Sequence, residues 1–108
     1  MKFYKLVTYV PQTHAGAVRK SLGDAGIGKF EKYTYCSFSV VGTGRFTPLE
    51  GASPAIGEVG RPEEVEEECI QTVCPESLID IAIAAIKSVH PYQQFAVHFT
   101  ELHEKSLL

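Results

Sequence analysis

The chain has 108 residues, of which 44% are hydrophobic and 21% charged, and its formal net charge is −3. This size and balance are those of one small globular domain and exclude a disordered chain. The 10 lysine and arginine residues are scattered, so we expect no basic face for nucleic acid. No apolar run approaches the roughly 20 residues that a membrane span needs, and the first residues show no signal-peptide cleavage pattern.

The chain contains 3 cysteines, Cys36, Cys69 and Cys74. Their number is odd and no Cys-x-x-Cys motif occurs, whereas a disulfide framework normally uses an even set. We therefore expect reduced thiols, which indicate a cytoplasmic protein.

Strand-like and helix-like patterns follow one another in the order β-α-β-β-α-β. The strands are rich in β-branched and aromatic residues, and the helices carry apolar residues three and four positions apart. The expected elements are a strand at 3–10, a helix capped by Thr13 with an apolar stripe ending at Ala25, strands at 31–41 and 64–73, a helix at 75–89 and a strand at 94–101.

The first strand is apolar on both of its alternating faces. Leu6 and Val10 lie on one face, and Phe3, Val7 and Tyr9 lie on the other. A strand with only one covered face would alternate more cleanly between apolar and polar residues. We therefore expect a central strand that is covered on both sides.

The order of the elements predicts an α+β, ferredoxin-like fold, with a four-stranded antiparallel sheet and both helices on one face. The other face of the sheet is then open and carries aromatic residues, either Phe3 and Tyr9 or Tyr33 and Tyr35. An open aromatic face favours packing between subunits. We therefore expect a homo-oligomer, either a trimer or a dimer.

A long glycine- and proline-rich loop, 42–60, is expected between the second and third strands. Loops of this length in small domains are usually functional or docked on a partner. It opens with Thr43, Gly44 and Arg45, whose backbone N–H groups and guanidinium could bind a small anion. The alternative is that the glycines serve turn geometry and close packing, because no Gly-Lys-Ser/Thr phosphate loop is present.

The second helix is apolar nearly all round, so we expect it to be largely buried. Pro75 suits its first turn. His90 and Pro91 are typical of a helix end, which would account for them without a function. The alternative is that His90 and Tyr92 contact a ligand, since imidazole can bind a metal or act as an acid or base.

Thiol and imidazole groups could hold a soft divalent metal such as zinc or copper. The candidate ligands are Cys36, His90 and His98, with Cys69 and Cys74 as further thiols. Their spacings match no standard metal motif, and buried free cysteines often pack as small hydrophobic residues. We therefore predict no cofactor, and a divalent metal stays as an alternative.

A cluster of glutamates lies at 63–68. Paired carboxylates can perform acid/base chemistry, but a solvated loop and strand edge is the preferred interpretation, because such charge also discourages unwanted strand pairing. No assembled catalytic motif is present, so no catalytic residue is assigned.

Several motifs together resemble one family: Gly42–Pro48, Gly51–Pro54, Ile56–Gly57, Gly60 and His90–Tyr92. The combination, spread from Lys5 to about Leu102, resembles the inserted domain of the YqfO-type NGG-interacting-factor-three family. The resemblance implies a CutA- and PII-like ferredoxin fold that tends to associate, here as a stand-alone chain. A single CutA-like domain is expected at 1–102, followed by a loose tail at 103–108.

In that family the flanking domains carry a two-metal site. They are absent from this sequence, so the metal-dependent hydrolase activity proposed for the family is not carried over. The leading hypothesis is a self-associating, non-enzymatic binding or regulatory module of unknown ligand. One alternative is a metal- or small-anion-binding protein that uses clefts between subunits near the 42–60 loop. Another is a partner of a separately encoded two-metal protein.

Overall fold

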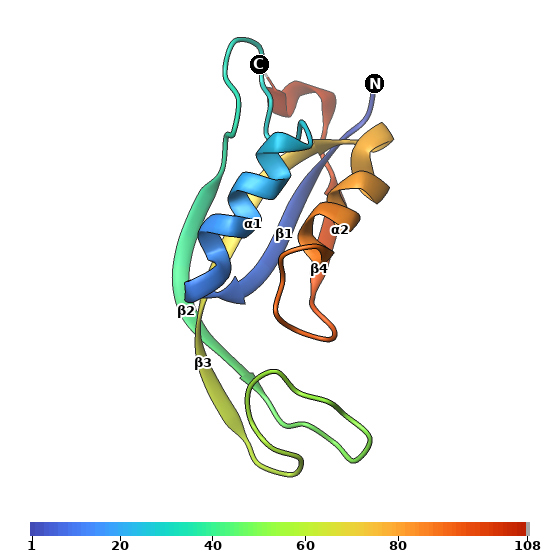
Figure 1. Cartoon of the computed structure of the whole chain (residues 1–108). Helices are drawn as coiled ribbons and strands as arrows, with labels where there is room; N and C mark the ends of the chain where they lie inside the picture. The colour runs from blue at the N-terminus through green and yellow to red at the C-terminus, as the bar shows by residue number, and fades with distance from the viewer. Residues whose placement is uncertain (108) are drawn as a thin grey trace.

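The computed structural model describes residues 1–107 and, within them, has four strands and two α-helices in the order β-α-β-β-α-β (Figure 1). The predicted ferredoxin-like order is therefore confirmed. Two short 3-10 helices, η1 and η2, accompany these elements. The bounds are β1 Phe3–Pro11, α1 Gln12–Asp24, β2 Phe38–Phe46, β3 Glu63–Pro75, η1 Glu76–Leu78, α2 Ile79–Lys87, β4 Val97–Glu101 and η2 Glu104–Leu107.

The sheet has the strand order β2-β3-β1-β4, and every neighbouring pair is antiparallel. Both α-helices cover the same face (Figure 1). On that face the alternate residues Leu6 and Val10 of β1 are fully buried, and they meet the stripe that Val18 and Leu22 form on α1. The hydrophobic core thus lies between the sheet and the two helices, as the sequence patterns indicate.

No α-helix lies on the other face of the sheet within the described part of the chain, and the 47–62 loop and the 91–96 segment reach only one end of it (Figure 1). β1 is central, as predicted, but its second face is only partly covered: Tyr9 is 40% exposed, and Phe3 and Val7 are half-buried. Of the two aromatic pairs expected there, Phe3 and Tyr9 are the ones on this face. Tyr33 and Tyr35 precede β2 and belong to no strand.

The second strand begins at Phe38, not at residue 31 as predicted. Before it, Phe30 and Tyr33 close a tight turn, and the non-glycine residues Glu31 and Tyr35 have positive φ angles. A left-handed backbone cannot continue a strand. Extended pairing therefore starts only where Phe38 meets Gln71 of β3.

The second strand also ends later than predicted. Residues 42–46 belong to β2 and pair with residues 67–63 of β3, so the irregular segment is 47–62 and not 42–60. The two paired strands extend beyond the helices as a hairpin, and the 47–62 loop folds back at its end (Figure 1). Pairing with β3 outweighs the low strand propensity of the two glycines in this stretch.

The helix boundaries were also predicted with errors. The N-cap of α1 is Pro11, and Thr13 lies inside the helix, where its hydroxyl contacts Nδ1 of His14 at 2.8 Å. Pro75 ends β3 opposite Phe3 and is the N-cap of the 3-10 helix η1 that leads into α2, so it lies just before the first helical turn and not in it. No helix in the described residues is long and apolar enough to cross a membrane.

The second helix, α2, is shorter and less buried than predicted. Only Ala82 and Ile86 are fully buried in it, whereas Ile81 is 48% exposed. The prediction was wrong because a helix in a two-layer fold meets the sheet on one side and solvent on the other. β3 is longer than predicted, and β4 begins at Val97 instead of residue 94, because residues 91–96 form a loop.

Candidate functional site

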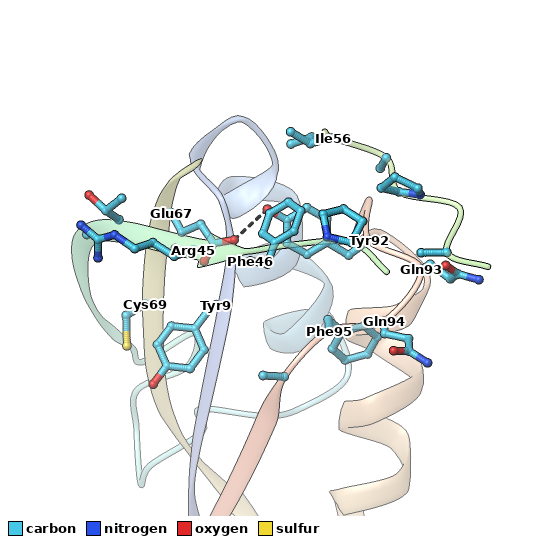
Figure 2. Close-up of a pocket in the computed structure, with 18 of the residues that line it drawn as sticks. Tyr9, Arg45, Phe46, Ile56, Glu67, Cys69, Tyr92, Gln93, Gln94 and Phe95 are labelled. Atoms are coloured by element: carbon cyan, nitrogen blue, oxygen red, sulfur yellow. Dashed lines mark hydrogen bonds between the residues drawn. The ribbon is translucent and has the colours of Figure 1, made fainter. Parts of the chain in front are cut away.

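A cavity of about 570 Å³ lies where the β2–β3 hairpin, the 47–62 loop and the 91–96 segment meet (Figure 2). Its apolar lining includes Val40, Phe46, Pro54, Ile56 and Phe95. Polar groups at its surface come from four different parts of the chain. They are the side chains of Tyr9, Thr43, Glu67, Cys69, Tyr92, Gln93 and Gln94.

The two glycines of β2, Gly42 and Gly44, lie on the strand face that lines this cavity. A Cβ atom at Gly44 would lie 2.0 Å from Oε1 of Glu67, but a Cβ atom at Gly42 would meet nothing within 4 Å. A side chain at position 44 would therefore displace the carboxylate. The absence of a side chain at Gly44 thus lets the Glu67 carboxylate lie over the strand, whereas Gly42 has no such role.

The carboxylate above Gly44 is bound by a tyrosine from the opposite wall. The hydroxyl of Tyr92 donates to Oε2 of Glu67 at 2.8 Å (Figure 2), and the Tyr92 ring packs edge-to-face on Phe46 with centroids 5.8 Å apart. Burial raises the pKa of Tyr92, and the hydrogen bond to Glu67 and the charges of Glu67 and Glu63 raise it further. The phenol is therefore a neutral donor at physiological pH.

His90 is buried behind the cavity and is not part of its lining. Its Nε2 lies 2.8 Å from the backbone oxygen of Tyr9, and its Nδ1 accepts the backbone N–H of Tyr92 at 3.1 Å. This pair of contacts requires a neutral ring with its proton on Nε2. Burial lowers the pKa of His90, which favours the same neutral form.

The imidazole of His90 therefore fastens the 91–96 segment to β1. The ring also stacks on Phe95, with centroids 4.9 Å apart. Because both nitrogens are engaged, neither offers a lone pair to a metal in this arrangement.

Arg45 lies at the rim of the cavity, but its guanidinium is committed elsewhere. Its Nε donates to Oε2 of Glu64 at 2.8 Å in an exposed pair. Thr43, Gly44, Arg45 and Tyr92 thus lie together at one cavity, and His90 lies behind them. A ligand-binding role for these residues stays a prediction.

The three candidate metal ligands lie in separate places. Cys36 is exposed in the segment before β2, His90 is buried, and His98 lies on β4 with its ring 6.4 Å from that of Tyr9. Within residues 1–107 no group of three or more His, Cys, Asp or Glu side chains could hold a metal ion. All three cysteines are free, and burial raises the pKa of Cys74 to about 11.

The glutamate cluster is not simply a solvated edge, so that expectation was wrong in part. Glu68 is 8% exposed and forms an ion pair with Arg19 of α1. Burial opposes ionisation of Glu68, but hydrogen bonds from Ser39 and Arg19 outweigh it and lower its pKa. Glu67, on the opposite face of β3, is a cavity residue that sequence reasoning missed.

Tyr9, Cys69 and Phe95 are further lining residues that were not predicted. For Tyr9, Cys69 and Glu67, the available signal was the alternation of side chains between the two faces of a strand, whereas Phe95 lies in a loop and had no such signal. Residues of odd number on β1 and β3 lie on the open face. That signal becomes useful only once the strand register is known.

The comparisons with known proteins agree with this fold. No protein-family model matches the sequence. A GTP cyclohydrolase 1 type 2 homolog of Halalkalibacterium halodurans is 46% identical over 91 residues, which are 84% of this chain and 24% of that protein. One from Bacillus subtilis is 46% identical over 92 residues, 85% of this chain and 25% of that protein.

Among solved structures, CutA1 from Oryza sativa has a TM-score of 0.69 at 16% identity and covers 99% of this chain and 88% of its own, so it shows the fold alone. The architecture is thus that of the CutA-type ferredoxin-like proteins. The Bacillus cereus protein related to NIF3 has a TM-score of 0.83 at 43% identity, covering 95% of this chain and 26% of that one.

The chain belongs to the NIF3-related, YqfO-type family, as the counterpart of its ferredoxin-like inserted domain. It spans about a quarter of the length of the relatives that it matches.

Proposed function

We propose that this domain is a self-associating, non-enzymatic binding module that holds a small ligand in the cavity beside the 47–62 loop. The observation that carries the proposal is the apolar edge of the open sheet. On β2, Phe38 is 65% exposed and Val40 47%. These two side chains lie on the open face of the sheet, opposite Gln71 and Cys69, whereas Val41 lies on the other face of the strand. Exposed apolar side chains on an uncovered sheet face are typical of an interface.

The position of β2 in the sheet supports self-association. β2 lies at the edge and pairs with β3 on one side only within the described residues. Its 9 residues therefore present backbone N–H and C=O groups to any strand that approaches. An exposed apolar edge strand without a proline or lysine guard favours pairing with another chain. Either a dimer or a trimer could supply hydrogen-bond partners for the backbone groups along β2.

The groups near the cavity support binding instead of catalysis. Both ring nitrogens of His90 are used in hydrogen bonds to the backbone, and the phenol of Tyr92 is bound to Glu67. Neither His90 nor the protonated Tyr92 can act as a general base in this arrangement, since that role needs a free lone pair within reach of the substrate. These residues give the cavity its shape and its charge, and the 570 Å³ volume lies within the range of small-molecule sites.

A cytoplasmic setting is part of the proposal and is supported by the three free cysteines. The small-anion alternative has less support, because Arg45 is paired with Glu64 and the carboxylate of Glu67 lines the cavity. The remaining alternative is a partner of a separately encoded two-metal protein, which co-purification would reveal.

Light scattering coupled to size-exclusion chromatography tests the self-association. The wild type is expected to elute as a dimer or trimer, and Phe38→Glu is expected to elute as a monomer, because a carboxylate cannot be buried without a partner. Ile81→Glu is the matched control, since Ile81 is a 48% exposed apolar residue on α2, and it should leave the mass unchanged. A monomeric wild type at high micromolar concentration would refute the proposal.

A further inference from the structure

The cavity combines apolar walls with an excess of negative charge. Glu67 and Arg45 are the charged residues that line it. The guanidinium of Arg45 is neutralised by Glu64, whereas no ion pair to Glu67 occurs among the described residues. Glu63, four residues before Glu67 on the same strand face, adds a second carboxylate nearby. The unneutralised charge at the cavity is therefore negative.

The carboxylate of Glu67 has unused hydrogen-bonding capacity. Tyr92 donates one hydrogen bond to Oε2, while an ionised carboxylate has about four acceptor positions. The backbone of β2 approaches closely at Gly44, so no side chain from that position shields the group. Glu67 can therefore accept further hydrogen bonds from a ligand in the cavity.

Aromatic rings stand beside this carboxylate. Phe46 and Tyr92 pack edge-to-face next to it, and Tyr9 and Phe95 line another part of the cavity (Figure 2). Rings of this kind attract a cation to their faces, and apolar walls favour the hydrocarbon part of a ligand. An anion would meet an unneutralised carboxylate in the same place, which disfavours it.

From this arrangement we infer that the cavity binds a small organic amine in its cationic form. The ammonium group pairs with Glu67 beside the Phe46 and Tyr92 rings, and the apolar body lies between the hairpin and the 91–96 segment. This inference rests on the proposed binding function and names its ligand class.

A titration followed by ¹H–¹⁵N NMR tests the inference with three compounds that share one phenyl ring. They are 2-phenylethylamine, which is cationic at neutral pH, 2-phenylethanol, which is neutral, and phenylacetate, which is anionic. We expect the amine to shift the signals of residues 40–46 and 92–96 and to bind about tenfold more tightly than the alcohol, as one charge-assisted hydrogen bond would give. Phenylacetate should give no saturable shift.

Two variants that each remove one negative charge distinguish a direct ion pair between the amine and Glu67 from a general attraction to the negative charge of the strand. Glu67→Gln keeps an acceptor for Tyr92 and should lower the affinity for the amine to that for the alcohol. Glu66→Gln removes an exposed carboxylate from the opposite strand face and should leave the amine affinity unchanged. Equal binding of all three compounds, or an amine affinity that Glu67→Gln does not change, would overturn the inference.

The oligomeric state, measured on the same samples, keeps the two proposals distinguishable. If the wild type is a monomer that still binds the amine, the self-association fails and the amine site stands. If an oligomer forms and the amine leaves the cavity signals unmoved, the cavity serves another purpose, such as contact with a second copy, and the amine site is refuted.

Discussion

Replacing Gly44 with alanine would test the packing on which the candidate site depends. The new Cβ atom would lie 2.0 Å from Oε1 and 2.4 Å from Cδ of Glu67, far inside van der Waals contact. The carboxylate is the end of a flexible side chain, so it would rotate away and leave the Tyr92 hydroxyl without its acceptor. Gly42→Ala is the matched control, because its Cβ atom meets nothing within 4 Å.

The two substitutions share one effect and differ in another. Alanine in place of a strand glycine stabilises the fold by about 0.5–1 kcal/mol, because the unfolded chain loses freedom. Only Gly44→Ala also breaks the hydrogen bond from Tyr92 to the carboxylate, which contributes about 1.5 kcal/mol at the lower end of the range for charged acceptors. Gly42→Ala should therefore be more stable than the wild type, and Gly44→Ala slightly less stable.

Urea denaturation of both variants measures this difference, which we expect to be about 1.5 kcal/mol in the free energy of unfolding, or roughly 6 °C in Tm. In a Glu67→Ala background the clash is absent, and Gly44→Ala should then stabilise as Gly42→Ala does. Equal stabilisation by both glycine substitutions in the wild-type background would show that the Glu67 carboxylate does not lie over Gly44.

Three further results are expected. Gly28→Ala should destabilise the domain by about 3 kcal/mol in urea denaturation, because φ is +80° and the Cβ atom would lie 2.5 Å from the backbone oxygen of Cys36. Gly51→Ala is the control: its φ is +95°, but its Cβ atom would lie in open space, so it should destabilise by only about 1 kcal/mol. The depressed pKa of His90 means that the unfolded chain takes up a proton at higher pH than the folded one. Stability should therefore fall as pH drops below about 6.5, and His90→Gln should flatten that slope in denaturation curves measured at several pH values. At pH 8 a thiol reagent should label the exposed Cys36 quickly and the buried Cys74, whose pKa is raised to about 11, only after unfolding; rapid labelling of Cys74 in the native protein would contradict its burial.

Local patterns in the sequence were sufficient to predict the order of the helices and strands and the residues of the hydrophobic core. The alternation of Leu6 and Val10 on β1 and the spacing of Val18 and Leu22 on α1 identify buried positions correctly, because strand and helix periods are properties of short segments. The β-α-β-β-α-β order then leaves few ways to cover one face of the sheet. The open aromatic face with Tyr9 follows from the same reasoning.

Boundaries and contacts between distant residues required the tertiary structure. Residues 42–46 have the composition of a loop, and only pairing with β3 makes them a strand. Glu66, Glu67 and Glu68 look alike in the sequence, yet register directs one to solvent, one to the cavity and one to Arg19. A one-residue change in register would exchange these roles.

The fold class, the buried faces and the family motifs can be read from local periodicity and from contiguous residues. Three contacts became known only from the folded chain: Glu67 accepts from Tyr92, His90 supports the cavity from behind, and Arg45 pairs with Glu64. These contacts join residues up to 81 positions apart, and no local pattern records which distant partner a side chain will meet.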